Sequence, residues 1–232
     1  MEPGQPLHIA YEDTHLLLLN KPAGLLVQPT GEPCTDRHDA QTMLSQQVGY
    51  RVWPAHRIDR GTSGLVVMVK EQGWLPVVQS LFQDRLIEKH YLAWIIGVMK
   101  PESGVLETAL AVPHGNGKVQ TACTHYQTLD TLTLDFPNQR PSQCTFSLVE
   151  VGLQTGRKHQ IRRHFGAAGH PLLGDHNYGS NNINRLLARY FKSHHLWLHA
   201  HRLAFHQPFT GLRVEIECPP PTEWNALHRH IS

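Results

Sequence analysis

A carboxylate flanked by two arginines is the first feature of the sequence with chemical potential. Asp59 lies between Arg57 and Arg60, and the Gly-containing segment around it runs directly into the apolar segment 65–70. This order predicts a loop at the entry of a buried strand, where catalytic groups are common. The neighbouring positive charges favour an ionised carboxylate, which suits a nucleophile or a general base. A structural ion pair or a local cap is the simpler alternative.

A second feature is a run of basic residues at the start of a predicted helix. Six basic or titratable side chains fall within residues 157–164, with no acid among them. Their mutual repulsion is unfavourable unless an anion or a buried carboxylate offsets it. Because arginine forks bind phosphate oxygens in pairs, we expect phosphates to bind most of them, and one arginine could reach Asp59 instead. A solvated basic surface is the alternative. The candidates for phosphate binding are Arg157, Lys158, His159 and Arg163.

A third feature is the strand-like segment 89–97, which contains two aromatic residues. Strand alternation places Lys89, Tyr91 and Ala93 on one face, and His90, Leu92 and Trp94 on the other. A tyrosine that faces a basic surface can stack on a nucleobase. Simple packing in the core is the alternative for Tyr91.

Hydrophobic periodicity predicts many strands with interspersed helices. Their order lacks regular βαβ alternation, so we expect an α+β fold around a mixed or largely antiparallel sheet, in one domain over residues 1–232. Thr155 is expected to cap the helix 158–168, with Ile161, Phe165 and Ala168 facing the core. The other expected helices are 40–48, 75–86, 183–192 and 222–230. The expected strands are 9–11, 16–20, 65–70, 89–97, 124–136, 145–151, 196–205 and 212–218.

The charge is distributed unevenly along the chain, although the formal net charge is only +2. Residues 1–150 carry a net charge of −4, and residues 214–232 carry −2. Residues 151–213 hold nine Lys and Arg against the single acid Asp175, a net charge of +8. Such a basic region is typical of a protein with a polyanionic partner.

The 18 histidines raise the alternative of a metal-dependent hydrolase. The best candidate ligands are His194, His195, His199, His201 and His206. Their spacing matches no HExxH or similar motif, which argues against a metal site. We interpret the histidines as structural groups and as groups that face a polyanionic partner, so affinity for that partner is expected to rise as the pH falls from about 7.5 to 6.

The four cysteines lie far apart and form no CxxC pair, which argues against a zinc ribbon. Cys144 and Cys218 lie in apolar runs and are expected to be buried thiols, Cys34 and Cys123 being the other two. We find neither a signal peptide nor an apolar segment near the ~20 residues of a membrane span. A cytoplasmic protein is therefore expected.

Taken together, these segments resemble RluA-type pseudouridine synthases, including their tRNA-modifying TruC-like branch. Residues 56–64 resemble the motif H-R-L-D-x-x-T-S-G, with Ile58 in place of Leu, and residues 155–164 resemble T-G-R-x-H-Q-[IL]-R-x-H. Further matches are Asn20–Gly24 to N-K-P-x-G, Lys89–Ala93 to K-x-Y-x-A, His170–Gly179 to H-P-[IL]-x-G-D-x-x-Y-G, Leu198–Ala200 to L-H-A, and Pro208–Gly211 to P-F-T-G, where Gln207 replaces the usual His.

The resemblance implies the α+β pseudouridine synthase core with flanking helices and a central RNA-binding cleft. It implies isomerisation of a uridine in RNA, without metal or organic cofactor. Asp59 would be the catalytic carboxylate, as nucleophile or base; Tyr91 would stack on the target base, and Arg162 would pair with Asp59. Arg57 would fill the space of the flipped nucleotide. Arg57 and Arg60 are both expected to bind RNA, together with the phosphate-binding candidates named above.

The substrate and assembly follow from the same resemblance. The chain begins almost at the first core strand, so we expect no N-terminal S4-type RNA-binding domain. This favours a tRNA or another short stem-loop as substrate, with large-subunit ribosomal RNA as the alternative. A non-catalytic RNA-binding protein of the same fold is a more remote possibility. We expect a monomer.

Overall fold

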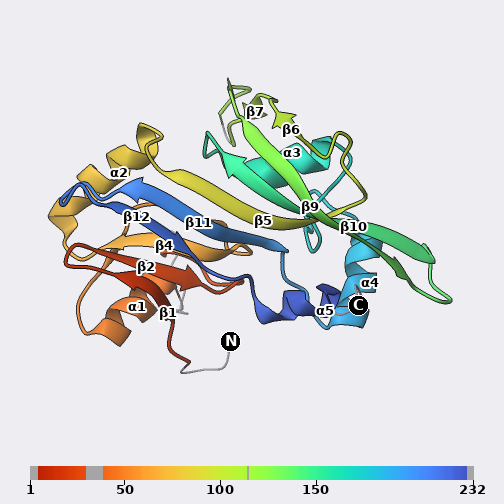
Figure 1. Ribbon diagram of the computed structural model, residues 1–232, viewed down its shortest axis with the longest axis horizontal. Helices are drawn as coiled ribbons and strands as arrows, with labels where there is room; N and C mark the ends of the chain where they lie inside the picture. Colours follow the sequence, from red (N-terminus) through yellow and green to blue (C-terminus); the bar gives the residue numbers. More distant parts are fainter. Residues whose placement is uncertain (1–4, 30–38, 114, 229–232) are drawn as a thin grey trace. The chain divides into compact units, whose positions relative to one another are not determined.

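The computed structural model of the protein describes residues 5–29, 39–113 and 115–228, and Figure 1 shows its helices and strands. Contacts within the chain define two units. Unit 1 comprises Met1–Lys89 and Ala200–Pro219, and unit 2 comprises His90–His199 and Pro220–Ser232. Each unit is therefore built from segments that are far apart in the sequence. Cys34 lies outside the described residues.

Unit 1 contains a sheet whose strands are β1 (His8–Glu12), β2 (Leu16–Lys21), β3 (Trp53–Pro54), β4 (Ser63–Val69), β11 (Leu198–His206, from Ala200 in this unit) and β12 (Arg213–Glu217). β1 pairs antiparallel with β2, β2 with β4, β3 with β4, and β11 with β12. β4 lies between β2 and β11. Every residue of β4 is buried, because its apolar run supplies both faces of a central strand.

Two helices belong to unit 1. α1 (Ala40–Val48) begins where the Asp39 side chain accepts a hydrogen bond from the Thr42 N–H, and it ends at Gly49 in the left-handed conformation. α2 (Leu75–Gln83) follows the short 3₁₀ helix η1 (Gln72–Trp74). It ends three residues earlier than expected, since Arg85 adopts a positive φ of 60°.

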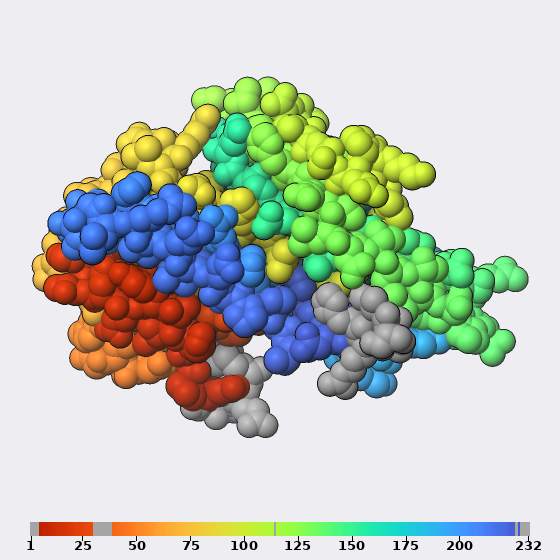
Figure 2. All heavy atoms as spheres, in the orientation of Figure 1, coloured from red at the N-terminus to blue at the C-terminus, as the bar shows by residue number. Residues whose placement is uncertain are grey.

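Distant parts of the sequence meet closely inside unit 1. In Figure 2 the N-terminal strands (red) and the strands β11 and β12 (blue) lie side by side on one surface of this unit. Gly64 at the start of β4 has φ +107°, and a Cβ at this position would collide with the backbone of Ala200 in β11. Only glycine satisfies both the conformation and the close approach.

Unit 2 contains the strands β5 (Glu88–Ile96, from His90 in this unit), β6 (Ser103–Leu106), β9 (Thr124–Asp135) and β10 (Gln143–Leu153). They lie in the order β5-β10-β9-β6, and each neighbouring pair is antiparallel. A separate hairpin consists of β7 (Leu110–Ala111) and β8 (Val119–Gln120). The sequence patterns did not predict β3, β6, β7 or β8, because such short strands have too few residues for a period.

The helix α3 (Gln160–Ala167) packs on the face of the unit 2 sheet that carries Tyr91, as the strand pairing shows. Tyr91 pairs with Val151, and Val151 pairs with Tyr126 on the next strand, so all three side chains share a face. The Tyr126 ring lies 5.9 Å from the ring of Phe165 in α3. α3 therefore covers the Tyr91 face.

The opposite face of this sheet is covered by α4 (Asn181–Phe191). Leu92 and Trp94, which alternate with Tyr91, pack in one cluster with Leu186 and Leu187 of α4. Figure 1 shows α3 and α4 on the two sides of β9 and β10. The expected alternation of faces along 89–94 is confirmed.

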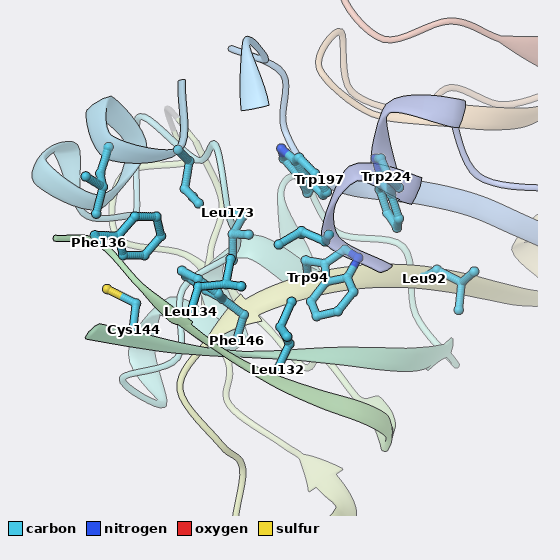
Figure 3. Close-up of a cluster of buried hydrophobic side chains, with 13 residues drawn as sticks. Leu92, Trp94, Leu132, Leu134, Phe136, Cys144, Phe146, Leu173, Trp197 and Trp224 are labelled. Carbon is cyan, nitrogen blue, oxygen red and sulfur yellow. The ribbon is translucent and has the colours of Figure 1, made fainter. Parts of the chain in front are cut away.

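Trp94, Trp197 and Trp224 lie in the hydrophobic core of unit 2, as Figure 3 shows. The rings of Trp197 and Trp224 are stacked at 5.5 Å with an interplanar angle of 18°. Trp224 ends the 3₁₀ helix η2 (Thr222–Trp224), which leads into α5 (Asn225–His228). Leu173 and Phe146 complete the same cluster beside Trp94.

The fold class is α+β with a mostly antiparallel sheet, as expected. Cys144 and Cys218 are buried, as expected. Two details of the predicted helix 158–168 are wrong. The helix begins at Gln160, with His159 and not Thr155 at its N-cap position. Ala168 lies beyond the helix end and is exposed. Within the described residues, no helix has the length and apolar character needed to cross a membrane.

Candidate active site

The loop that carries Asp59 connects β3 to β4 in unit 1. Ile58 is buried directly before Asp59, and the Thr62 N–H donates to the Asp59 carbonyl at 3.1 Å. Asp59 itself is partly buried. The chain is thus anchored on both sides of this carboxylate, at the entry of a buried strand as the sequence predicted.

Lys21, at the end of β2, lies beside this loop with no exposed surface. Its Nζ donates to the carbonyls of Pro22 at 2.9 Å, Leu25 at 2.8 Å and Arg60 at 3.3 Å. Removal from water lowers the pKa of Lys21 to about 7, against the opposing effect of the Asp59 carboxylate. Lys21 therefore ties the chain after Asp59 to β2. The sequence analysis assigned Lys21 no role, although its place in the Asn-Lys-Pro motif could have marked it as a candidate.

The two arginines beside Asp59 differ in their surroundings, although both are exposed. Arg60 Nε donates to the Gly24 carbonyl at 2.8 Å, and the Gly24 N–H donates back to the Arg60 carbonyl at 2.8 Å. Arg60 thereby holds its own loop against the turn after β2. The expected RNA contact of Arg57 stays a prediction.

His56 supports the same loop as a neutral imidazole. Its Nε2 accepts a hydrogen bond from the Val67 N–H at 3.1 Å, and its ring lies 4.3 Å from that of Phe82. Desolvation and then the positive charge of Lys89 lower the pKa of His56 to about 3, although part of the residue stays exposed. His56 therefore adds no positive charge at mildly acidic pH.

Tyr91 lies in the middle of β5 in unit 2 and is 9% exposed. It shares the sheet face covered by α3, which carries Arg162. The structure thus brings the two predicted residues of unit 2 to one face of one sheet. Asp59 belongs to unit 1, and its pairing with Arg162 stays a prediction.

Arg162 makes a two-point ion pair with Asp175. Its Nε donates to Asp175 Oδ2 at 2.7 Å, and its Nη2 donates to Asp175 Oδ1 at 2.9 Å. The Asp175 side chain has no exposed surface, and that of Arg162 is 11% exposed. Burial alone would raise the pKa of Asp175, but the bonds from Arg162 and from two backbone N–H groups lower it below the usual value. Sequence reasoning placed Asp175 within a motif but assigned it no partner.

The predicted phosphate-binding residues surround the start of α3. Lys158 is exposed, while Arg157, His159 and Arg163 are partly buried. Arg157 Nε donates to the Thr121 carbonyl at 3.2 Å. Arg163 Nη1 donates to the Ala111 carbonyl at 3.0 Å. Both arginines therefore also attach α3 to the β7–β8 hairpin and the residue after it.

Three polar residues of this segment, Thr155, Gln160 and His164, are buried and form hydrogen bonds. Thr155 donates from Oγ1 to Gln160 Oε1 at 2.7 Å, and Gln160 Nε2 donates to Thr124 Oγ1 at 2.9 Å. His164 bonds Thr124 Oγ1 at 2.9 Å and lies 3.1 Å from the Thr108 carbonyl. Desolvation lowers the pKa of His164. These bonds explain why Thr155 does not cap the helix.

Among the residues that the structure describes, no three His, Cys, Asp or Glu side chains are grouped to hold a metal ion. His201 Nδ1 lies 2.8 Å from the Cys218 carbonyl, and His206 Nδ1 lies 3.3 Å from the Gly211 carbonyl. The His199 ring packs 6.2 Å from Trp224. These candidate ligands make local structural contacts.

A family model described as RNA pseudouridylate synthase matches residues 15–167. The match covers more than half of the chain and includes Asp59, Tyr91 and Arg162. The chain belongs to the RNA pseudouridylate synthase family. This family is one of isomerases, so the predicted family and the predicted reaction class are confirmed.

Curated relatives of this family match nearly the whole chain. The tRNA pseudouridine synthase C of Vibrio parahaemolyticus is 34% identical over 233 residues, covering 95% of this chain and 93% of the relative. The tRNA pseudouridine synthase C of Pasteurella multocida is 33% identical over 230 residues, covering 94% and 93%.

Solved structures of the family share the fold. The structure of human RNA pseudouridylate synthase domain containing 4 matches with a TM-score of 0.74 at 27% identity, covering 96% of this chain and 92% of that chain. Human RNA pseudouridylate synthase domain containing 1 matches with a TM-score of 0.75 at 23% identity, covering 95% and 87%. The second likeness concerns the fold alone.

Proposed function

We propose that the protein converts a uridine of tRNA to pseudouridine, with Asp59 as the catalytic carboxylate. The observation that carries the activity is the position of Asp59 on an anchored loop at the entry of β4, within the family match. The preference for tRNA is supported by the full-length similarity to relatives named tRNA pseudouridine synthase C. Large-subunit ribosomal RNA is the alternative substrate.

The reaction is an isomerisation in which one bond replaces another on the same sugar. The bond between N1 of uracil and C1′ breaks, the base rotates, and a bond forms between C5 and C1′. The C5 proton leaves and N1 gains a proton, so no co-reactant is consumed. Asp59 would act as nucleophile at the sugar or as base toward one of its protons. In the same proposal Tyr91 stacks on the target base, and Arg162 pairs with Asp59.

RNA binding must offset the cost of moving the target base out of its stack, about a few kcal/mol. Contacts to phosphates can supply this free energy without reading sequence. We assign them to Arg157, Lys158, His159 and Arg163, with Arg57 and Arg60 beside Asp59. Arg57 would occupy the space of the flipped nucleotide.

The activity is tested by replacing Asp59 with Asn, which removes the charge but keeps the shape. The variant is expected to lose tritium release from tRNA containing uridine tritiated at C5, by at least about 10³-fold, because the reacting carboxylate is gone. Binding of tRNA should survive. The exposed Asp84 of the same unit gives the matched control, Asp84→Asn, which should keep full turnover. Full turnover by the Asp59→Asn enzyme would refute the catalytic assignment.

The substrate class is tested separately by mapping pseudouridines with carbodiimide in total RNA from a deletion strain and its parent. A signal that disappears from one tRNA position supports the proposal. A loss confined to large-subunit ribosomal RNA would replace tRNA by the alternative substrate.

We also propose that the protein acts in the cytoplasm as a monomer without metal or organic cofactor. The proposed carboxylate chemistry requires neither. Activity that survives chelation by EDTA, and a monomer mass in light scattering of the active protein, are the expected results. Loss of activity restored by one added metal would overturn the cofactor proposal.

A further inference from the structure

We infer that the outer face of α4 is a second RNA-binding surface, which contacts phosphates of the tRNA away from the target uridine. The face is formed by three cations, Arg185, Arg189 and Lys192. The inference rests on the proposed function, because it assigns a further part of the proposed substrate to this face. The three residues and every contact used below belong to unit 2.

The three cations share one side of α4, with spacings of four and three residues. Positions at this spacing lie above one another on a helix, and all three side chains are exposed. Leu186 and Leu187, which lie between them in the sequence, are buried. The cations span about 10 Å along the helix axis, which is longer than one phosphate group. The face therefore suits a strand of linked phosphates better than a single small anion.

No acid neutralises this face within the described part of the chain. Residues 176–214 contain no Asp or Glu, and no described carboxylate forms an ion pair with the three cations. Arg185 Nε donates to the Asn181 carbonyl at 3.2 Å, and its Nη2 donates to Asn182 Oδ1 at 2.8 Å. Both acceptors are neutral. They use two of the five N–H donors of the guanidinium, so the others remain available to a phosphate.

The helix dipole accounts for only part of this charge. Cations near the C-terminus of a helix are favourable, which applies to Arg189 and Lys192. Arg185 lies in the middle of α4, and its spacing of four residues from Arg189 brings two like charges together, which destabilises a helix. A surface that only contacts solvent does not require this repulsion, whereas a bound polyanion offsets it.

This face and α3 lie on opposite sides of the unit 2 sheet (Figure 1). α4 packs in one cluster with Leu92 and Trp94, whereas α3 covers the side that carries Tyr91. Two helix diameters of about 10 Å each, and the sheet itself, therefore separate the outer faces of the two helices. Phosphates bound by α4 must then belong to a different part of the RNA from those bound at α3. A tRNA with several stems offers such a part, and a single stem-loop does not.

The test compares whole tRNA with a stem-loop cut from it around the modified position. The variant with Arg185→Gln, Arg189→Gln and Lys192→Gln is expected to bind whole tRNA at least about tenfold more weakly. The slope of log K against log salt should fall by about 2, because three phosphate contacts are lost. The Kd for the stem-loop and the single-turnover rate at saturating tRNA should equal those of the wild type, because the face does not contact the reacting nucleotide.

Two further variants separate the loss of these contacts from a general effect of charge or folding. The matched control removes three exposed cations that lie outside α3 and α4, by Arg51→Gln, Lys100→Gln and Arg140→Gln. It should leave both Kd values unchanged. Arg185→Lys with Arg189→Lys keeps the charge and should retain most of the affinity for whole tRNA. Thermal unfolding checks that each variant is folded.

Two results would overturn the inference while leaving the proposed function intact. One is a triple variant that binds whole tRNA with the affinity and salt slope of the wild type, which would leave this face to an acidic protein. The other is an equal loss of affinity for the stem-loop, which would make the face part of the site around the target uridine. A wild-type enzyme that does not modify tRNA would instead refute the proposed function.

Discussion

Lys21 brings a titratable cation into a fully buried position, and three carbonyls replace its water shell. In the folded protein burial lowers the pKa of Lys21 to about 7, from the ordinary lysine value of 10.5. Between these two values the unfolded chain binds more protons than the folded one. The contribution of Lys21 to stability therefore rises with pH from about 7 to about 10.5.

This titration predicts a pH-dependent difference between the wild type and Lys21→Met. The difference in the free energy of unfolding, wild type minus variant, should increase as the pH rises above 7. The increase should be at most about 1.4 kcal/mol per pH unit. Urea unfolding at pH 7, 8 and 9 measures the difference. Parallel pH profiles would show that Lys21 keeps its usual pKa in the folded state.

Sequence reasoning picked out the candidate catalytic residues more readily than the residues that hold them in place. Asp59, Tyr91 and Arg162 were recognisable from motifs and lie in the predicted loop, strand and helix. The partners Lys21 and Asp175 were present in motifs without a role. Their contacts join positions 39 and 13 residues apart, and such pairings are set by tertiary structure and not by local periodicity.

At the scale of elements, the strand β4 requires a glycine at position 64, where its pairing with β2 begins. Gly64→Ala would require an unfavourable φ and would collide with the Ala200 backbone. We expect the free energy of unfolding to fall by at least about 2 kcal/mol. Urea unfolding measures this, with Gly73→Ala as control, since no atom lies within 4 Å of a Cβ there. Equal stability of the two variants would contradict the tight approach of β4 and β11.

Several elements were predictable from local sequence patterns, such as the alternation of buried and exposed residues along β9. α1 was predicted with its observed bounds, and the strands β9 and β10 within a few residues. The start of α3 was misplaced because the Thr155 hydroxyl bonds Gln160 from outside the helix. A capping motif in the sequence cannot distinguish this contact from a cap.

At the scale of the whole molecule, the charge of residues 151–213 should govern RNA binding. Lys158→Gln combined with Arg163→Gln should weaken tRNA binding and reduce the slope of log K against log salt by about 1 to 2, because fewer counterions are released. Arg51→Gln with Lys100→Gln removes two exposed cations outside this segment and should leave the slope unchanged. Equal slopes in the wild type and both double variants would show that Lys158 and Arg163 do not contact the phosphates of the RNA.

The discontinuity of unit 1 has a consequence for synthesis on the ribosome. β4 is made early, yet its neighbour β11 follows only after the 90–199 segment of unit 2. A nascent chain that ends before Leu198 therefore carries β4 without its partner β11, so that β3 alone covers the end of one edge at Met68 and Val69. Such exposed edges are prone to association. The β9–β10 hairpin, contiguous in the sequence, can form first. Ribosome stalling ahead of β11 should thus leave an aggregation-prone fragment, whereas release after β12 should not.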